Sequence, residues 1–157
     1  MAINDPRQEG DGVADLLIKF QDSVLEHLER AIPQPVYEQA VPDATNLRKV
    51  NGKLLPYVAL QFGDLQRKAG GNTFAGVRTY DYELPIYVQV CAADPGTARR
   101  IASGRVLDAL LGLSGNGTGE VRKRPGGGMF PVVNSNAATE AYLFPSSWAV
   151  TVQISHN

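Results

Sequence analysis

Two long stretches in which apolar and polar residues alternate constrain the fold of this chain more than any other feature. In RTYDYELPIYVQVC, residues 78–91, every even position from Tyr80 to Val90 is aliphatic or aromatic. The stretch AYLFPSSWAVTVQIS, residues 141–155, shows the same alternation, with Trp148 and Val150 on its apolar side. A period of two places successive side chains on opposite faces of a strand. Both stretches therefore predict half-buried β-strands.

Three shorter stretches predict further strands. LLPYVALQF, residues 54–62, alternates strongly, whereas PVYEQAV, residues 35–41, and MFPVV, residues 129–133, are weaker candidates. Pro85 and Pro145 interrupt the two long strands and have no amide proton to donate to a neighbour. We expect them at a sheet edge or a bulge.

Two segments have the apolar spacing of helices. The first runs from Val13 to Leu28, with Asp11 as its N-cap and residues 1–10 as a loose arm before it. Pro33 and Pro35 end this helix. Two i,i+4 pairs are expected to support it, Asp15 with Lys19 and Glu26 with Arg30.

The second helix begins after Asp94, its predicted N-cap, with Pro95 in the first turn, and it ends at Gly112 and Gly115. Leu107 and Leu111 lie off its apolar stripe. They form either a surface for a partner or part of a deeply buried helix. The expected buried stripe is Ala98, Ile101, Ala102, Val106, Ala109, Leu110 and Leu113.

This element order predicts one α+β domain over residues 1–157, with two helices covering one face of a mainly antiparallel sheet. The net charge of −1 argues against a dedicated nucleic-acid-binding protein, which normally has a basic surplus. Cys91 is the single cysteine, so an internal disulfide is excluded. We expect no signal peptide, no membrane span and a reducing cytoplasm as the place of synthesis.

A glycine-rich basic segment, GLSGNGTGEVRKRPGGG, spans residues 112–128 and contains Arg122, Lys123 and Arg124. It follows a helix and lacks the Lys-Ser ending of a phosphate-binding loop, so nucleotide binding is not expected. Three interpretations stay open: a solvated loop, a mobile segment that docks on a protein partner, and a nucleic-acid contact.

A second glycine-containing segment, DLQRKAGGNTFAGVR, spans residues 64–78 and is expected to be a long loop between two strands. Arg67 and Lys68 give it positive charge. Phe74 is either an exposed anchor for a partner's pocket or a residue that folds back onto its own core.

Residues capable of catalysis are few. His27 is expected on the polar side of the first helix, and His156 lies near the chain end, so neither completes a metal site or a nucleophile pair. Cys91 is expected to be a small packing residue. Asp81 and Glu83 share one strand face, where solvation or an inter-subunit contact is favoured over acid–base work. We predict no enzyme, no metal and no cofactor.

The order of elements resembles the tail terminator proteins of long-tailed bacteriophages. The likeness covers residues 12–155 and rests on RTYDYELPIYVQV, on the helix DPGTARRIASGRVLDALLG and on the closing strand SSWAVTVQI. The glycine-rich basic segment departs from that pattern.

The resemblance implies a structural virion protein that assembles in the host cytoplasm into a homo-hexameric ring. Such a ring ends polymerisation of the tail tube protein and offers a docking surface to the head–tail connector or stopper. Asp81 and Glu83 would then suit a bore or an inter-subunit contact, with DNA passing without specific binding. Arg67, Lys68, Phe74, Leu107, Leu111 and Arg122–Arg124 would be interface residues. The alternatives are another neck protein or, in a different class, a ligand-binding or regulatory domain.

Overall fold

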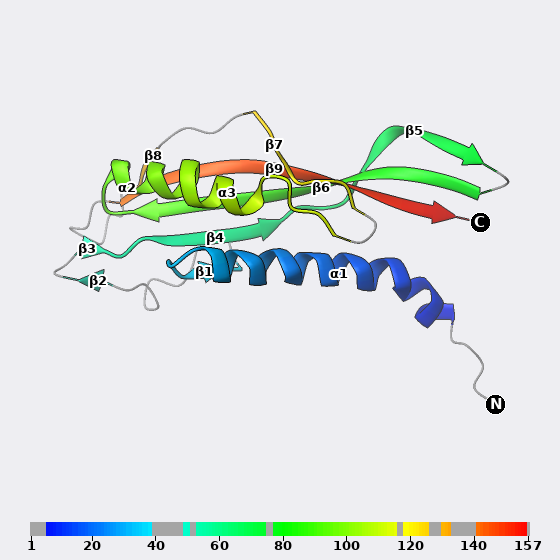
Figure 1. Ribbon diagram of the computed structural model, residues 1–157, viewed down its shortest axis with the longest axis horizontal. Coiled ribbons are helices and arrows are strands. Elements are labelled where there is room, and N and C mark those ends of the chain that lie inside the picture. Colours follow the sequence, from blue (N-terminus) through cyan, green and yellow to red (C-terminus); the bar gives the residue numbers. More distant parts are fainter. Residues whose placement is uncertain are drawn as a thin grey trace.

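The computed structural model of the chain describes residues 6–38, 49–50, 53–74, 77–115, 118–125, 130–132 and 141–156. It confirms the predicted α+β fold with a mainly antiparallel sheet and two helical segments packed on it (Figure 1).

The sheet has seven strands arranged about two long central ones. The order across it is β1 (Val36–Tyr37), β4 (Tyr57–Phe62), β6 (Val77–Ala92), β9 (Ala141–His156) and β7 (Arg122–Lys123). Two strands lie off this path: β5 (Gln66–Phe74) pairs with β6, and β8 (Phe130–Val132) pairs with β9. Only β1 and β4 run parallel among the described pairs. A separate two-stranded ladder joins β2 (Lys49–Val50) to β3 (Lys53–Leu54).

Strands β6 and β9 are the two alternating stretches of the sequence, and they pair antiparallel over almost their whole length. Their register places Ile86 opposite Trp148 and Leu84 opposite Val150. The even-numbered residues of both strands therefore share one face, as the alternation predicts. Most of them are buried beneath the helices.

The prediction that Pro85 and Pro145 occupy a sheet edge or bulge was wrong, because β6 and β9 are central strands. Pro85 lies where β4 ends and β5 begins, since β4 pairs with β6 from Ile86 and β5 pairs as far as Glu83. Pro145 lies in the corresponding break between β8 and β7 beside β9. No described strand pairs with β6 at Pro85, or with β9 at Pro145, on the side of the break. The missing amide proton of each proline therefore costs no ladder hydrogen bond.

Helix α1 (Pro6–Ala31) starts earlier than the sequence predicts, so residues 6–10 are helical and Asp11 is not an N-cap. Residues 1–5 lie outside the described part. The helix ends before Pro33, as predicted, and the two expected ion pairs are present: Lys19 Nζ lies 3.0 Å from Asp15 Oδ2, and Arg30 contacts Glu26.

The second helix is continuous but changes its winding. It consists of α2 (Pro95–Arg100), a π-helical segment η2 (Ile101–Val106) and α3 (Leu107–Leu110). Asp94 caps it as predicted, since its Oδ1 accepts a hydrogen bond of 2.9 Å from the Thr97 amide. Gly112, with φ of +81°, ends it in a left-handed conformation that glycine adopts without strain.

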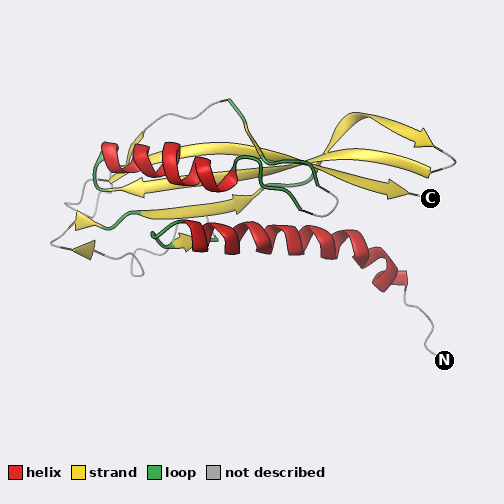
Figure 2. Ribbon diagram, in the orientation of Figure 1, coloured by secondary structure: helices red, strands yellow, loops and turns green. Residues whose placement is uncertain are grey.

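The core lies between the helices and one face of the sheet. Phe20, Val24 and Leu28 of α1 join Ile101, Val106 and Leu110 of the second helix and the even-numbered residues of β6 and β9. Figure 2 shows β5, β6 and β9 continuing past the end of the second helix, so part of the sheet extends beyond that cover.

Candidate functional site

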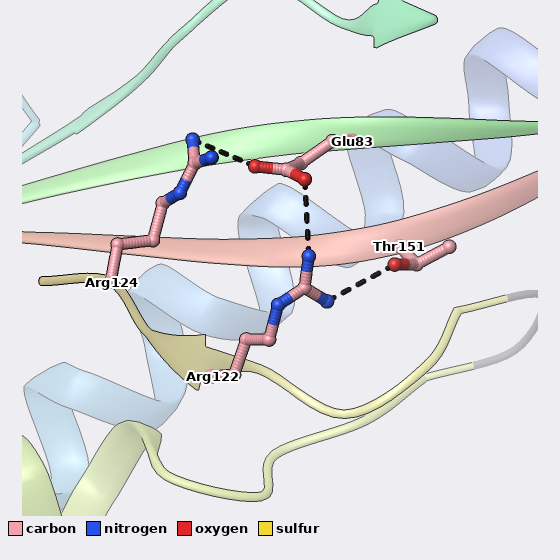
Figure 3. Close-up of polar contacts among 4 residues, drawn as sticks. All are labelled: Glu83, Arg122, Arg124 and Thr151. Carbon is pink, nitrogen blue, oxygen red and sulfur yellow. Dashed lines mark hydrogen bonds and ion pairs between the residues drawn. The ribbon is translucent and has the colours of Figure 1, made fainter. Parts of the chain in front are cut away.

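A cluster of two arginines around one buried glutamate lies on the sheet face that the core does not use. Glu83 of β6 has a side chain 10% exposed. Arg122 Nη2 donates to Glu83 Oε2 at 3.0 Å, and Arg122 Nη1 donates to Thr151 Oγ1 at 3.2 Å. Arg124 Nη1 lies 2.7 Å from Glu83 Oε1 and forms an ion pair with it. Figure 3 shows both guanidinium groups reaching across β9 to this carboxylate.

The backbone explains how these residues meet. Arg122 stands opposite Ala149 in the β7–β9 ladder, and the Arg124 amide donates to the Ser147 carbonyl at 2.8 Å. Thr151 stands opposite Glu83 in the next ladder. Residues opposite one another in a ladder share a face. The side chains of Arg122, Thr151 and Glu83 therefore converge.

Two expectations from the sequence are corrected here. Glu83 does not lie on a solvated face, because the two arginines cover it. Residues 122–124 do not form a free basic loop, because two of them make a short strand and two of the three side chains bind Glu83. Lys123 is exposed and Asp81 is partly exposed, so these two remain accessible.

The segment 64–78 is also not the long loop that was expected. Its residues Gln66–Phe74 form β5, which pairs with β6 in a hairpin that has one register shift between Arg67 and Gly71. Glycines in this strand accompany the irregularity. Arg67 is exposed, and the side chains of Lys68 and Phe74 lie outside the described part, so the anchor role of Phe74 stays a prediction.

The predicted stripe of the second helix is confirmed for Ala98 through Leu110, whose six predicted positions are buried. Leu107 is half-buried against the core, whereas Leu111 is 58% exposed. Of the two leucines off the stripe, only Leu111 therefore offers a substantial apolar surface.

A tyrosine and the cysteine form a second polar pair on the same sheet face. Tyr57 stands opposite Cys91 across the β4–β6 ladder, and its ring packs edge-on against Tyr37 with centroids 5.7 Å apart. Burial raises the pKa of the Tyr57 hydroxyl far above its usual value, and the neighbouring thiol adds to this. Burial also raises the pKa of Cys91, although the hydrogen bond from Tyr57 partly opposes that rise. A thiol held protonated is a poor nucleophile, as the packing role predicted for Cys91 requires.

These two raised pKa values predict a loss of stability in alkali. The folded protein keeps protons that the unfolded chain releases near its ordinary values of about 8.5 for cysteine and about 10 for tyrosine. The stabilisation is complete below about pH 8 and decreases as the pH rises from about 8.5 upward. Urea unfolding across this range should show a steeper fall for the wild type than for the double variant Tyr57→Phe, Cys91→Ala. Equal slopes would contradict the assignment.

His27 is exposed on α1, as expected, yet its Nε2 lies 3.0 Å from the Ala109 carbonyl oxygen. As a donor to that oxygen it ties α1 to the second helix, which its sequence context does not indicate. Within the described residues no group of three or more His, Cys, Asp or Glu side chains could hold a metal ion. No helix in the described part of the chain is long and apolar enough to cross a membrane.

A scan against models of known protein families finds no match to this chain, and a search of curated protein sequences finds none either. The Tyr37–Tyr57–Cys91 group and the Glu83 cluster were not predicted. Their members lie far apart in the sequence, and only the strand order and register bring them together.

Proposed function

We propose that this chain is a subunit of a ring that ends growth of a bacteriophage tail tube and then receives the head connector. The resemblance of element order to tail terminators supports the proposal. The confirmed α+β fold and the predicted positions of both helices agree with it.

One observation carries the proposal: both helices pack on the same face of the sheet. No described helix covers the opposite face, and the strands β5, β6 and β9 continue beyond the second helix (Figure 1). Such a subunit offers extended strands and a sheet face for contacts with other subunits. Tyr87, 41% exposed, lies on this face.

Because Glu83 is covered by two arginines, the acidic surface that could line the bore is smaller than the sequence suggested. Glu83 is neutralised by two arginines of its own chain, so Asp81 is the residue of the pair that could face DNA. The net charge of −1 suits a channel through which DNA slides without being held.

The proposal is tested by adding the purified protein to polymerising tail tube protein of the same phage. We expect tubes to stop growing, with a ring of about six 16.9 kDa subunits at one tube end in negative-stain images. An unchanged distribution of tube lengths at a molar excess of the protein would overturn the proposal. A connector or stopper protein would bind at the head side and leave tube growth unchanged, so the same assay separates these two roles.

A further inference from the structure

The outward surface of the second helix combines positive charge with an exposed leucine. Arg100, Gly104, Arg105 and Leu111 line a shallow hollow on it. A Cβ atom at Gly104 would meet nothing within 4 Å, so the backbone there is open to close approach. Asp108 lines the same hollow. Arg99, on the same helix, and Asp94, its N-cap, are also exposed. We call Arg99, Arg100, Gly104, Arg105 and Leu111 the basic face.

The outward surface of α1 has the opposite charge around its own exposed aliphatic residue. Asp15, Ile18, Asp22 and Glu29 recur at intervals of three, four and seven, which places them on one side of a helix. All four are exposed, and Ile18 is 55% exposed. Glu26 lies beside them and is paired with Arg30, as Asp15 is with Lys19. Asp15, Ile18, Asp22, Glu26 and Glu29 form the acidic face.

We infer that the acidic face of one copy docks on the basic face of the next copy. This inference rests on the proposed ring and specifies which surfaces join its subunits. The two faces are complementary in charge, and each presents an aliphatic side chain, Ile18 on one and Leu111 on the other. The bare backbone at Gly104 lets an incoming helix approach closely.

In a ring this contact is heterologous, so every subunit keeps one unused face for the next and the contacts propagate around the ring. Pairing of like faces would bring together mainly charges of one sign, which is unfavourable. Exposed ion pairs contribute little individually and are screened by salt. The association is therefore expected to weaken as salt rises, with the aliphatic contact supplying the part that salt does not weaken.

Charge reversal tests the pairing. One variant carries Asp22→Arg and Glu29→Arg, and the other carries Arg100→Glu and Arg105→Glu. The new residues have helix propensities similar to the old ones or better, and all four positions are exposed, so folding should be preserved and is checked by circular dichroism. In sedimentation at low salt, each variant alone should self-associate at least ~10-fold more weakly than the wild type.

A 1:1 mixture of the two variants provides the decisive measurement. Each reversed face is complementary to the reversed face of the other variant, so mixing should restore assemblies of the wild-type mass. Reversals at exposed positions outside both faces, Lys53→Glu and Glu120→Arg, are matched controls and should assemble normally. Normal assembly of either double variant alone, failure of the mixture to recover, or a wild type that stays monomeric at low salt would overturn the inference.

These outcomes are independent of the tube assay. If a double variant still forms rings and still stops tube growth, the proposed function stands and this interface is wrong. If the wild type forms rings that respond to charge reversal but tube growth is unchanged, the interface stands and the proposed function is wrong.

Discussion

Replacing both Arg122 and Arg124 with alanine should lower the free energy of unfolding by about 3 kcal/mol, because it removes two positive charges that contact a buried carboxylate. Glu83 is 10% exposed, and both guanidinium groups that neutralise it belong to these two residues. The value is at the lower end of the usual range for a broken buried pair, because removal of the arginines admits water to Glu83. Urea denaturation followed by circular dichroism measures the change.

Two variants separate the charge effect from a general effect of shortening side chains in β7 and at the residue after it. Adding Glu83→Gln to the double variant removes the buried charge and should recover most of the lost stability. Lys123→Ala, in the same strand but exposed, should change the free energy of unfolding by no more than about 0.5 kcal/mol. A double variant within about 1 kcal/mol of the wild type would show that the cluster contributes little to stability.

Trp148→Ala should lower the free energy of unfolding by about 3–5 kcal/mol, a large part of the ~5–15 kcal/mol typical of a whole domain. Trp148 is fully buried at the centre of β9. Its Nε1 donates to Ser146 Oγ at 3.0 Å, and Ser146 Oγ donates to the Val88 carbonyl at 3.4 Å. The substitution opens a cavity and leaves the serine oxygen without its donor.

Trp148→Phe keeps most of the ring volume and loses only the indole hydrogen bond, so it should cost less than the alanine variant. Because Trp148 is the only tryptophan, unfolding of both variants has to be followed by circular dichroism. Equal stability of the alanine variant and the wild type would mean that the surrounding core collapses into the space, contrary to the packing seen around β9.

The periodicity of apolar residues along the chain was sufficient to predict most of the helices and strands. The alternation in residues 78–91 and 141–155 predicted the two central strands and the face each buries, and the cap at Asp94 was placed correctly. Errors arose where a local rule has more than one outcome. Glycines in residues 64–78 indicated a loop, yet pairing with β6 made that segment a strand with a register shift. The start of α1 was missed because its first residues lack apolar periodicity.

The sequence by itself determined the α+β class, the burial pattern of the long strands and the residues of the helical core, because these depend on side-chain periodicity along one segment. Tertiary structure alone decided the roles of Glu83, Arg122 and Arg124. Arg122 lies 39 positions from Glu83 in the chain, and the β6–β9–β7 order brings them within hydrogen-bonding distance. Periodicity describes neighbours along the chain, whereas a buried charge depends on partners that only strand pairing brings near.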